Sequence, residues 1–223
     1  MMGQRAYIPA LGQSFLLPLY DPLQRWIMRE PVLKGRLVEE TLIEPGQTVL
    51  DLGCGTGTLA VLIKKRHPQA HVVGLDIDPQ VLEYAGSKAR RAGVHIDFTQ
   101  ASALGLPYPS AHFDRVVSSL MLHHLRREQK ERALAEVWRV LKPDGLLCVA
   151  DFGRPHTRFT RSVALLVRHF EQVADNIDGL LPPLTERAGF DQVEERARYA
   201  TVFGTVTLYR GAKADAAEQQ GAA

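Results

Sequence analysis

The amino-acid sequence predicts an α/β protein in which a mostly parallel sheet is covered by helices on both faces. Through the middle of the chain, short β-type runs alternate with longer segments of helical period, which is the pattern typical of such a sheet. The 223 residues are enough to bury a core of this kind. A composition of 45% hydrophobic and 23% charged residues excludes a coiled coil and a wholly disordered chain.

Seven segments are expected to form the sheet. Five apolar runs are predicted to be its parallel strands: Val49–Gly53, His71–Ile77, Ile96–Ala101, Phe113–Leu120 and Leu146–Phe152. Two further runs, Gln192–Phe203 and Thr205–Arg210, are separated by Gly204 alone. Because a single residue cannot form a crossover helix, we expect these two strands to pair antiparallel.

Three helices are expected between the strands, at Leu59–Arg66, Gln80–Arg91 and Glu128–Leu141. The first two end in basic residues, which complement the negative end of a helix dipole, and the third stops before Pro143 and Gly145. Helix ends therefore explain the basic runs better than a phosphate-binding surface does. With 27 basic and 25 acidic residues the chain is also too nearly neutral to coat nucleic acid, so no nucleic-acid partner is expected.

We expect one domain with additions at its edges. Residues 41–210 form the sheet-containing domain, with a helical cap segment at 1–40, a cap insertion at 153–184 and a disordered tail at 211–223. The two cysteines cannot build a disulfide framework or a zinc site, and no metal is expected. The chain shows neither a signal peptide nor an apolar run of the roughly 20 residues that a membrane span needs, so it is predicted to be cytoplasmic.

Glycine recurs at every second position where the first predicted strand ends, in the run Val49-Leu50-Asp51-Leu52-Gly53-Cys54-Gly55-Thr56-Gly57. Alternate glycines let the backbone turn sharply and let a ligand approach the main chain. A dinucleotide fingerprint would need glycine or alanine in place of Thr58, and a P-loop would need a lysine, so neither pattern is met. The loop predicts a ligand site of another kind at the carboxyl end of this strand.

A carboxylate stands at the end of the second predicted strand, in Gly74-Leu75-Asp76-Ile77-Asp78-Pro79. Asp78 directly precedes a proline and is the better cap for the following helix. Asp76 is therefore left for a ligand, and a carboxylate there can accept hydrogen bonds from both hydroxyls of a ribose. Ile77 offers an apolar side chain to one face of an adenine ring.

Four motifs together resemble the class I S-adenosylmethionine-dependent methyltransferases, and most of all the branch of ubiquinone and menaquinone biosynthesis methyltransferases. They are VLDLGCGTG, GLDIDP, QASALGLPYPSAHFDRVVSSLMLHHL and EVWRVLKPDGLL, in the family's order and spacing, and the match is close from Leu42 to Phe152. The resemblance implies S-adenosyl-L-methionine as cofactor. It also implies a Rossmann-like three-layer sandwich with a helical cap, whose seven-stranded, mostly parallel sheet has an antiparallel last strand.

The resemblance further implies which residues contact the cofactor. Carried over by position, they are Asp51, Gly53, Gly55 and Thr56 for the methionine part, Asp76 for the ribose, Ile77, Ser102 and Ala103 for the adenine, and Ser119. Many relatives have aspartate in place of Ser102. A neutral hydroxyl accepts a hydrogen bond that is weaker by about 1 kcal/mol than one to a carboxylate, which predicts a modest affinity for the cofactor.

The catalytic residues stay open, because methyl transfer needs a general base only where the acceptor is a weak acid. The candidates are His123, His124, His156, Tyr20 and Asp151. The first two follow the fourth strand, near the expected acceptor, and their alternative role is to bond loop backbone. Tyr20 resembles a tyrosine that several relatives fold over the cofactor, with surface packing as its alternative. We expect Asp151 to be structural.

Acceptor recognition is expected outside the shared motifs, in the first forty residues and in Gly153–Leu184. Within the second segment, apolar residues at helical spacing are Phe159, Val163, Leu166, Val167, Phe170, Val173 and Ile177, and the residues on another face are Arg158, Arg161, Arg168 and Gln172. Two interpretations remain. Either this helix packs on the sheet with its arginines in water, or it forms a cap that has an apolar interior and a cationic rim and makes peripheral contact with a membrane.

The sequence thus predicts a methyltransferase acting on a small or lipid-like acceptor, of the quinone-precursor or phospholipid type. The alternative is a non-catalytic protein that binds S-adenosylmethionine as a sensor or partner-binding module. The accepting atom and the oligomeric state are left open.

Overall fold

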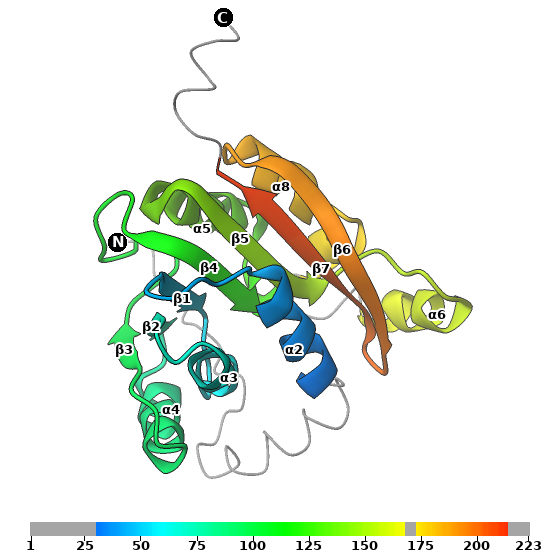
Figure 1. The fold of residues 1–223 in the computed structure, drawn as a ribbon. Coiled ribbons are helices and arrows are strands. Elements are labelled where there is room, and N and C mark those ends of the chain that lie inside the picture. The colour runs from blue at the N-terminus through cyan, green and yellow to red at the C-terminus, as the bar shows by residue number, and fades with distance from the viewer. Residues whose placement is uncertain (1–29, 168–172, 214–223) are drawn as a thin grey trace, which may run out of the picture.

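A seven-stranded sheet forms the centre of the molecule (Figure 1). The computed structural model describes residues 30–167 and 173–213. The strands are β1 Thr48–Leu52, β2 His71–Asp76, β3 Asp97–Gln100, β4 Phe113–Ser119, β5 Leu141–Phe152, β6 Asp191–Thr201 and β7 Gly204–Ala212. They lie in the order β3-β2-β1-β4-β5-β7-β6. The strands β1 to β5 are mutually parallel and β7 is antiparallel to both neighbours, which confirms the predicted sheet.

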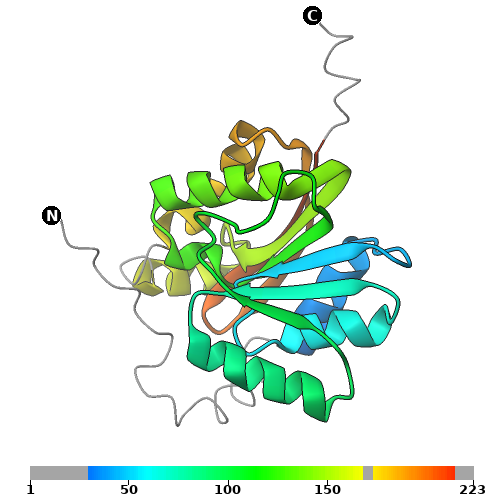
Figure 2. The ribbon, with the colours of Figure 1, turned by 90° about the vertical axis from the view of Figure 1, so that its left-hand side faces the viewer.

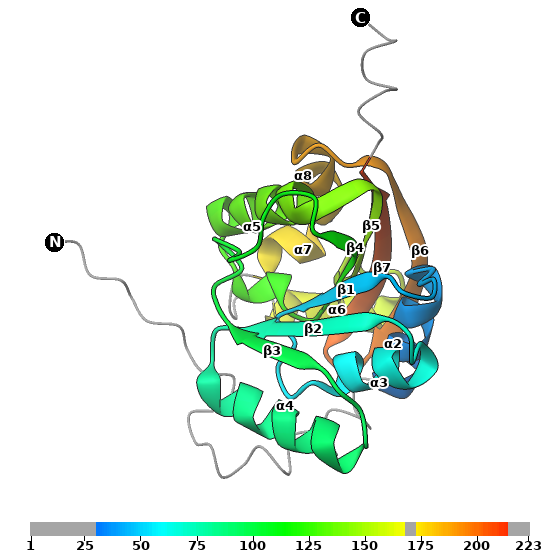
Figure 3. The ribbon, with the colours of Figure 1, turned by 60° about the vertical axis from the view of Figure 1, so that its left-hand side comes forward.

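Helices cover both faces of this sheet, as the two rotated views show (Figure 2, Figure 3). On one face lie α2 Glu30–Glu40, α3 Thr58–Arg66 and α4 Pro79–Arg91. On the other lie α5 Arg127–Val140, α7 Ala174–Ile177 and α8 Leu181–Arg187. A short 3-10 turn, η2 Leu122–His124, follows β4, and α6 Arg158–Val167 lies beside the β6–β7 hairpin.

Apolar residues on both sides of the central strands explain why the sheet is buried on both faces. In β1, Val49 packs with the core under α2 and α3, whereas Leu50 and Leu52 pack with the core under α5 and α8. Successive side chains of a strand point to opposite faces, so a continuous apolar run fits a strand between two helical layers. By the same alternation Asp51 points to the face that carries α2 and α3.

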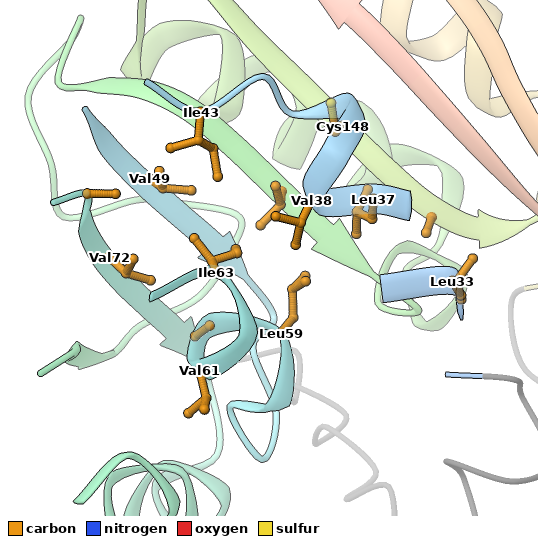
Figure 4. Packing of buried hydrophobic residues seen from close by; sticks show 14 of the residues in the cluster. Leu33, Leu37, Val38, Ile43, Val49, Leu59, Val61, Ile63, Val72 and Cys148 are labelled. Atoms are coloured by element: carbon orange, nitrogen blue, oxygen red, sulfur yellow. The ribbon is translucent and has the colours of Figure 1, made fainter. Parts of the chain in front are cut away.

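Helix α2 completes one of these layers. Its Leu33 and Leu37 are buried with Ile63 of α3 (Figure 4). Residues 30–40 therefore belong to the core, in contrast to the cap expected over residues 1–40. The rest of that segment, with Tyr20, lies outside the described residues.

Several predicted boundaries differ from the structure, most of all the start of β5. Strand β5 begins at Leu141, directly after α5, and reaches the register of Leu146 through an irregularity in its pairing with β4. Strand β7 continues to Ala212, two residues into the expected tail, because Gly211 and Ala212 pair with the early part of β5. Residues 214–223 lie outside the described part of the chain.

The buried face of α6 is not the predicted one. Thr160 and Ala164 are 0% and 7% exposed, whereas Phe159 and Leu166, expected to pack inward, are 58% and 71% exposed. Small side chains at Thr160 and Ala164 let the helix approach the rest of the molecule closely, which turns the larger residues outward.

Candidate functional site

The predicted ligand residues come together at the carboxyl ends of the parallel strands. Strand β1 lies between β2 and β4: the chain passes from β1 outward to β2 and β3, and then crosses back to β4 on the other side of β1. A crevice forms at such a switch point, where open α/β sheets bind their ligands. The ends of β1, β2, β4 and β5 contribute Asp51, Asp76, Ser119 and Asp151 to this edge.

The glycine loop after β1 has open space beside Gly55 but none beside Gly53. Gly53 and Gly55 have φ angles of +70° and +50°, which favour glycine. A Cβ at Gly53 would strike the Met121 side chain, whereas one at Gly55 would meet no atom within 4 Å. The amides of Gly53 and Cys54 bind the Leu75 carbonyl of β2 at 2.8 and 3.0 Å. A tethered loop with open space above Gly55 is suited to hold a ligand against the main chain.

The carboxylate of Asp76 is held in place by backbone amides. Its two oxygens accept from the amides of Gly55 at 2.9 Å and Asp78 at 3.1 Å. Burial raises the pKa of Asp76 above its ordinary value, although these bonds oppose the rise. Each oxygen keeps a lone pair with which to accept from a ligand hydroxyl. Asp78 accepts from the Gln80 amide at 2.9 Å and caps α4, as predicted.

Two buried polar atoms at the strand ends have no hydrogen-bond partner among the described residues, Oδ2 of Asp51 and Oγ of Ser119. Burial raises the pKa of Asp51 to about 7, and the charge of Lys34 lessens the effect. A buried polar atom without a partner costs about 1–3 kcal/mol of stability. Both atoms lie at predicted cofactor positions, and a cationic ligand would stabilise the charged form of Asp51.

The predicted adenine side shows an exposed apolar residue beside a fixed loop. Ile77, next to Asp76, is 43% exposed. Ser102 Oγ accepts from the Leu104 amide at 3.2 Å, which closes a turn and leaves the hydroxyl hydrogen for a ligand. Ala103 packs against the core at the edge of this turn.

Thr56 has a partner that the sequence did not reveal. Lys88 of α4 donates to the hydroxyls of Thr56 at 3.0 Å and Thr58 at 2.8 Å. These bonds tie the glycine loop to α4. Lys88 lies close to a basic helix end, so its position in the sequence gave no sign of this role.

Beyond β4 and β5 a histidine is bound to a buried carboxylate. His123 Nδ1 lies 2.9 Å from Asp151 Oδ1, and Asn176 Nδ2 of α7 donates to the same oxygen at 3.1 Å. The amides of His123 and Phe152 also donate to this carboxylate, at 3.3 and 2.7 Å. Burial alone would raise the pKa of Asp151, but the ring of His123 and these hydrogen bonds hold it below its ordinary value. The bond to Asp151 fixes the orientation of the imidazole.

The other base candidates have different surroundings. The exposed ring of His124 lies against that of His123, tilted by 40° and with centroids 4.0 Å apart. His156 Nδ1 lies 2.9 Å from Thr205 Oγ1 and joins the chain before α6 to β7. Tyr20 is outside the described residues.

Comparison with known proteins supports the resemblance to methyltransferases. A family profile described as a methyltransferase domain matches residues 49–145. The chain is 36% identical over 171 residues to the demethylmenaquinone methyltransferase of Thermus thermophilus, covering 75% of this chain and 76% of that protein. It is 32% identical over 193 residues to the ubiquinone/menaquinone biosynthesis C-methyltransferase of Vibrio cholerae, covering 76% of this chain and 72% of the relative.

Solved structures show the same fold at lower identity. A SAM-dependent methyltransferase from Aquifex aeolicus superposes with a TM-score of 0.63 at 17% identity, over 91% of this chain and 100% of that one. The sequence relatives identify the family, and the structural neighbour supports the Rossmann-like architecture.

Proposed function

Because the chain belongs to the family of S-adenosylmethionine-dependent methyltransferases, we propose that it methylates a ring carbon of a quinone precursor that carries a lipid-like side chain. The main support for this acceptor is the long match to two quinone-biosynthesis enzymes, each over more than two thirds of the relative's length. The name of the Vibrio cholerae relative includes C-methyltransferase, which favours carbon as the accepting atom. The non-catalytic alternative is not favoured, since these relatives are enzymes.

S-adenosylmethionine supplies a methyl group bound to a positively charged sulfur. We assign the methionine part to the glycine loop and the neighbouring ends of β1 and β4, where Asp51 and Ser119 each have a buried oxygen without a described partner. A carboxylate there favours a cation, and the open space at Gly55 admits the ligand to the main chain. Asp76 is the proposed ribose acceptor.

The adenine is assigned to the far side of Asp76. Exposed Ile77 would cover one face of the ring, and Ser102 and Ala103 would contact its edge. The hydroxyl of Ser102 serves best as a donor to a ring nitrogen, since it already accepts from Leu104.

We assign the general base to His123. Methylation of a hydroquinone at carbon forms a carbon–carbon bond, breaks the carbon–sulfur bond and releases one proton from the ring. Removing the proton of a ring hydroxyl makes the carbon more nucleophilic, so a base near that hydroxyl accelerates the reaction. With Nδ1–H donated to Asp151, the Nε2 atom of His123 carries the lone pair for this proton.

A methyl-transfer assay tests the proposed acceptor directly. Purified protein is incubated with methyl-labelled S-adenosylmethionine and either a short-chain prenylated naphthoquinol under reducing conditions or phosphatidylethanolamine vesicles. We expect label in the quinol, with carbon methylation seen by NMR of the product, and none in the phospholipid. Label in the phospholipid alone would overturn the acceptor, and tight cofactor binding without transfer to either would support a sensor.

Replacing Asp76 by alanine should weaken cofactor binding about 30-fold, since hydrogen bonds to a carboxylate in a half-buried site are lost, at a cost of about 2 kcal/mol. The matched control is Asp78→Ala, which removes a carboxylate two residues away that caps α4. We expect this control to lower stability by about 1 kcal/mol with cofactor affinity unchanged. Titration calorimetry and thermal unfolding measure both, and equal affinities for the two variants would contradict the ribose assignment.

A further inference from the structure

Exposed apolar side chains gather on one part of the surface. Eight large apolar residues are exposed in the described chain, and five of them lie on α6 or at the β6–β7 turn: Phe159, Leu165, Leu166, Val202 and Phe203. Leu165 and Leu166 are each 71% exposed. Single exposed apolar residues are common, but a cluster of them marks an interaction site.

The two parts of this cluster adjoin one another. Helix α6 lies beside the tip of the β6–β7 hairpin (Figure 1). The chain that leads into α6 is bonded to the start of β7, with Gly153 donating to the Thr205 carbonyl at 3.0 Å and His156 beside the Thr205 hydroxyl. We call the five apolar residues, together with Arg158 and Arg161, the α6–hairpin surface.

Arginines accompany the apolar residues of this surface. From Phe152 to Phe170 the sequence has four arginines and no acidic residue. Arg158 and Arg161 are exposed, and neither forms an ion pair with a described residue. Asp178 lines the same hollow as Arg161, so one carboxylate offsets part of the local positive charge. The surface as a whole remains cationic.

The same surface lies next to the proposed base. Phe152, at the end of β5, packs its ring edge against His123 with centroids 4.9 Å apart. On its other side Phe152 contacts the small cluster formed by Ala164 of α6 with Val173 and Ile177. The side chain of Phe152 therefore lies between His123 and the buried face of α6.

We propose that the α6–hairpin surface docks on an anionic lipid bilayer. Leucine and phenylalanine side chains would enter the boundary between headgroups and acyl chains, and the arginines would bind lipid phosphates. No helix in the described ranges is both long and apolar enough to span a bilayer, so this contact is peripheral. An apolar patch rimmed by two arginines that form no ion pair with a described residue fits a surface that is apolar and anionic together, which favours anionic lipid over a second copy of this near-neutral chain.

Vesicle sedimentation tests the surface without any turnover. Protein is mixed with vesicles of phosphatidylcholine alone or with about one third phosphatidylglycerol, at low and at physiological salt. We expect binding to the anionic vesicles that weakens with salt. Leu165→Gln/Leu166→Gln and Arg158→Gln/Arg161→Gln should each reduce the bound fraction at least fivefold, with S-adenosylmethionine affinity unchanged.

Matched controls test whether vesicle binding depends on this surface in particular or on exposed charge and apolar area anywhere on the protein. Val32→Gln removes an apolar side chain of similar exposure on α2, and Lys65→Gln/Arg132→Gln removes two exposed cations elsewhere. Both should bind vesicles like the wild type. Equal losses in the controls, or a wild type that never sediments with anionic vesicles, would overturn the proposal. So would a dimer in analytical ultracentrifugation that the Leu165→Gln/Leu166→Gln variant dissociates, because a second copy would then cover the surface.

This docking is independent of which acceptor the enzyme uses. If methyl transfer to a soluble short-chain quinol persists while vesicle binding is absent, the docking proposal fails and the proposed function stands. If the protein binds vesicles but methylates no quinol, the docking proposal stands and the proposed function fails.

Discussion

The Asp51→Asn variant should bind S-adenosylmethionine about 100-fold more weakly than the wild type and yet unfold at a higher temperature at pH 8. The loss of affinity follows from removing a buried charge that a cationic ligand would pair with, an interaction of about 2–3 kcal/mol. The gain in stability follows because one oxygen of that buried carboxylate has no hydrogen-bond partner among the described residues. Function and stability oppose each other at this residue.

The contribution of Asp51 to the stability of the wild type is expected to fall as the pH rises. In the folded protein burial raises the pKa of Asp51 from 3.8 to about 7, so the folded state holds a proton that the unfolded state releases. Stability is therefore unaffected below pH 3.8, falls as pH rises from there to about 7, and is lowest above it, by at most about 4 kcal/mol. Asparagine does not titrate, and its own buried amide costs part of the gain, so we expect a net rise of about 3–6 °C at pH 8 and less at pH 5.

Calorimetry measures both halves of this prediction. In the wild type, cofactor affinity should fall below pH 7, because protons compete with the cofactor for Asp51, whereas affinity of the variant should be flat from pH 6 to 8. Asp97→Asn, at an exposed aspartate on β3, should change neither affinity nor stability measurably. A variant that is less stable than the wild type at pH 8 would show that Asp51 is satisfied without ligand.

The turn after β1 and the cap of α4 could be predicted because backbone geometry requires particular residues there. Gly53, Gly55 and Gly57 have positive φ angles that favour glycine, and Asp78 lies directly before Pro79, so their roles can be deduced from the local sequence. The apolar residues Val49, Leu50 and Leu52 of β1, which alternate between its two faces, likewise indicate a strand buried on both faces. These features depend on residues that are close together in the sequence, so sequence patterns could predict them.

The proposed acceptor side depends on contacts between segments that are distant in sequence. His123 and Asp151 are 28 positions apart, and Asn176 reaches the same carboxylate from another helix. In α6, the helical period predicts an apolar stripe but does not say which side faces inward. The small volumes of Thr160 and Ala164 decide that orientation, and it leaves Phe159 and Leu166 on the surface.

The His123→Gln variant is expected to have a kcat for a quinol acceptor about 100- to 1000-fold below that of the wild type, the range for losing a general base. Asp151→Asn should lower it less, about tenfold or more, because asparagine can still contact the ring but no longer stabilises the protonated imidazole. Asp151 is a positioning residue in this scheme. Both variants should keep cofactor affinity within about threefold, since neither residue belongs to the proposed cofactor contacts.

The pH profile distinguishes a base from a buried structural histidine. A phenolic hydroxyl ionises near about pH 10, so without a base the rate of the His123→Gln variant should rise about tenfold per pH unit between pH 7 and 9. A histidine that only supports the fold would give a loss of activity that is constant over this range and parallels a fall in thermal stability. His124→Gln, which removes the exposed ring beside His123, is the matched control and should keep most of the activity. If this control alone shows the pH-dependent recovery, the proton is taken by His124, with His123 and Asp151 holding its ring in place.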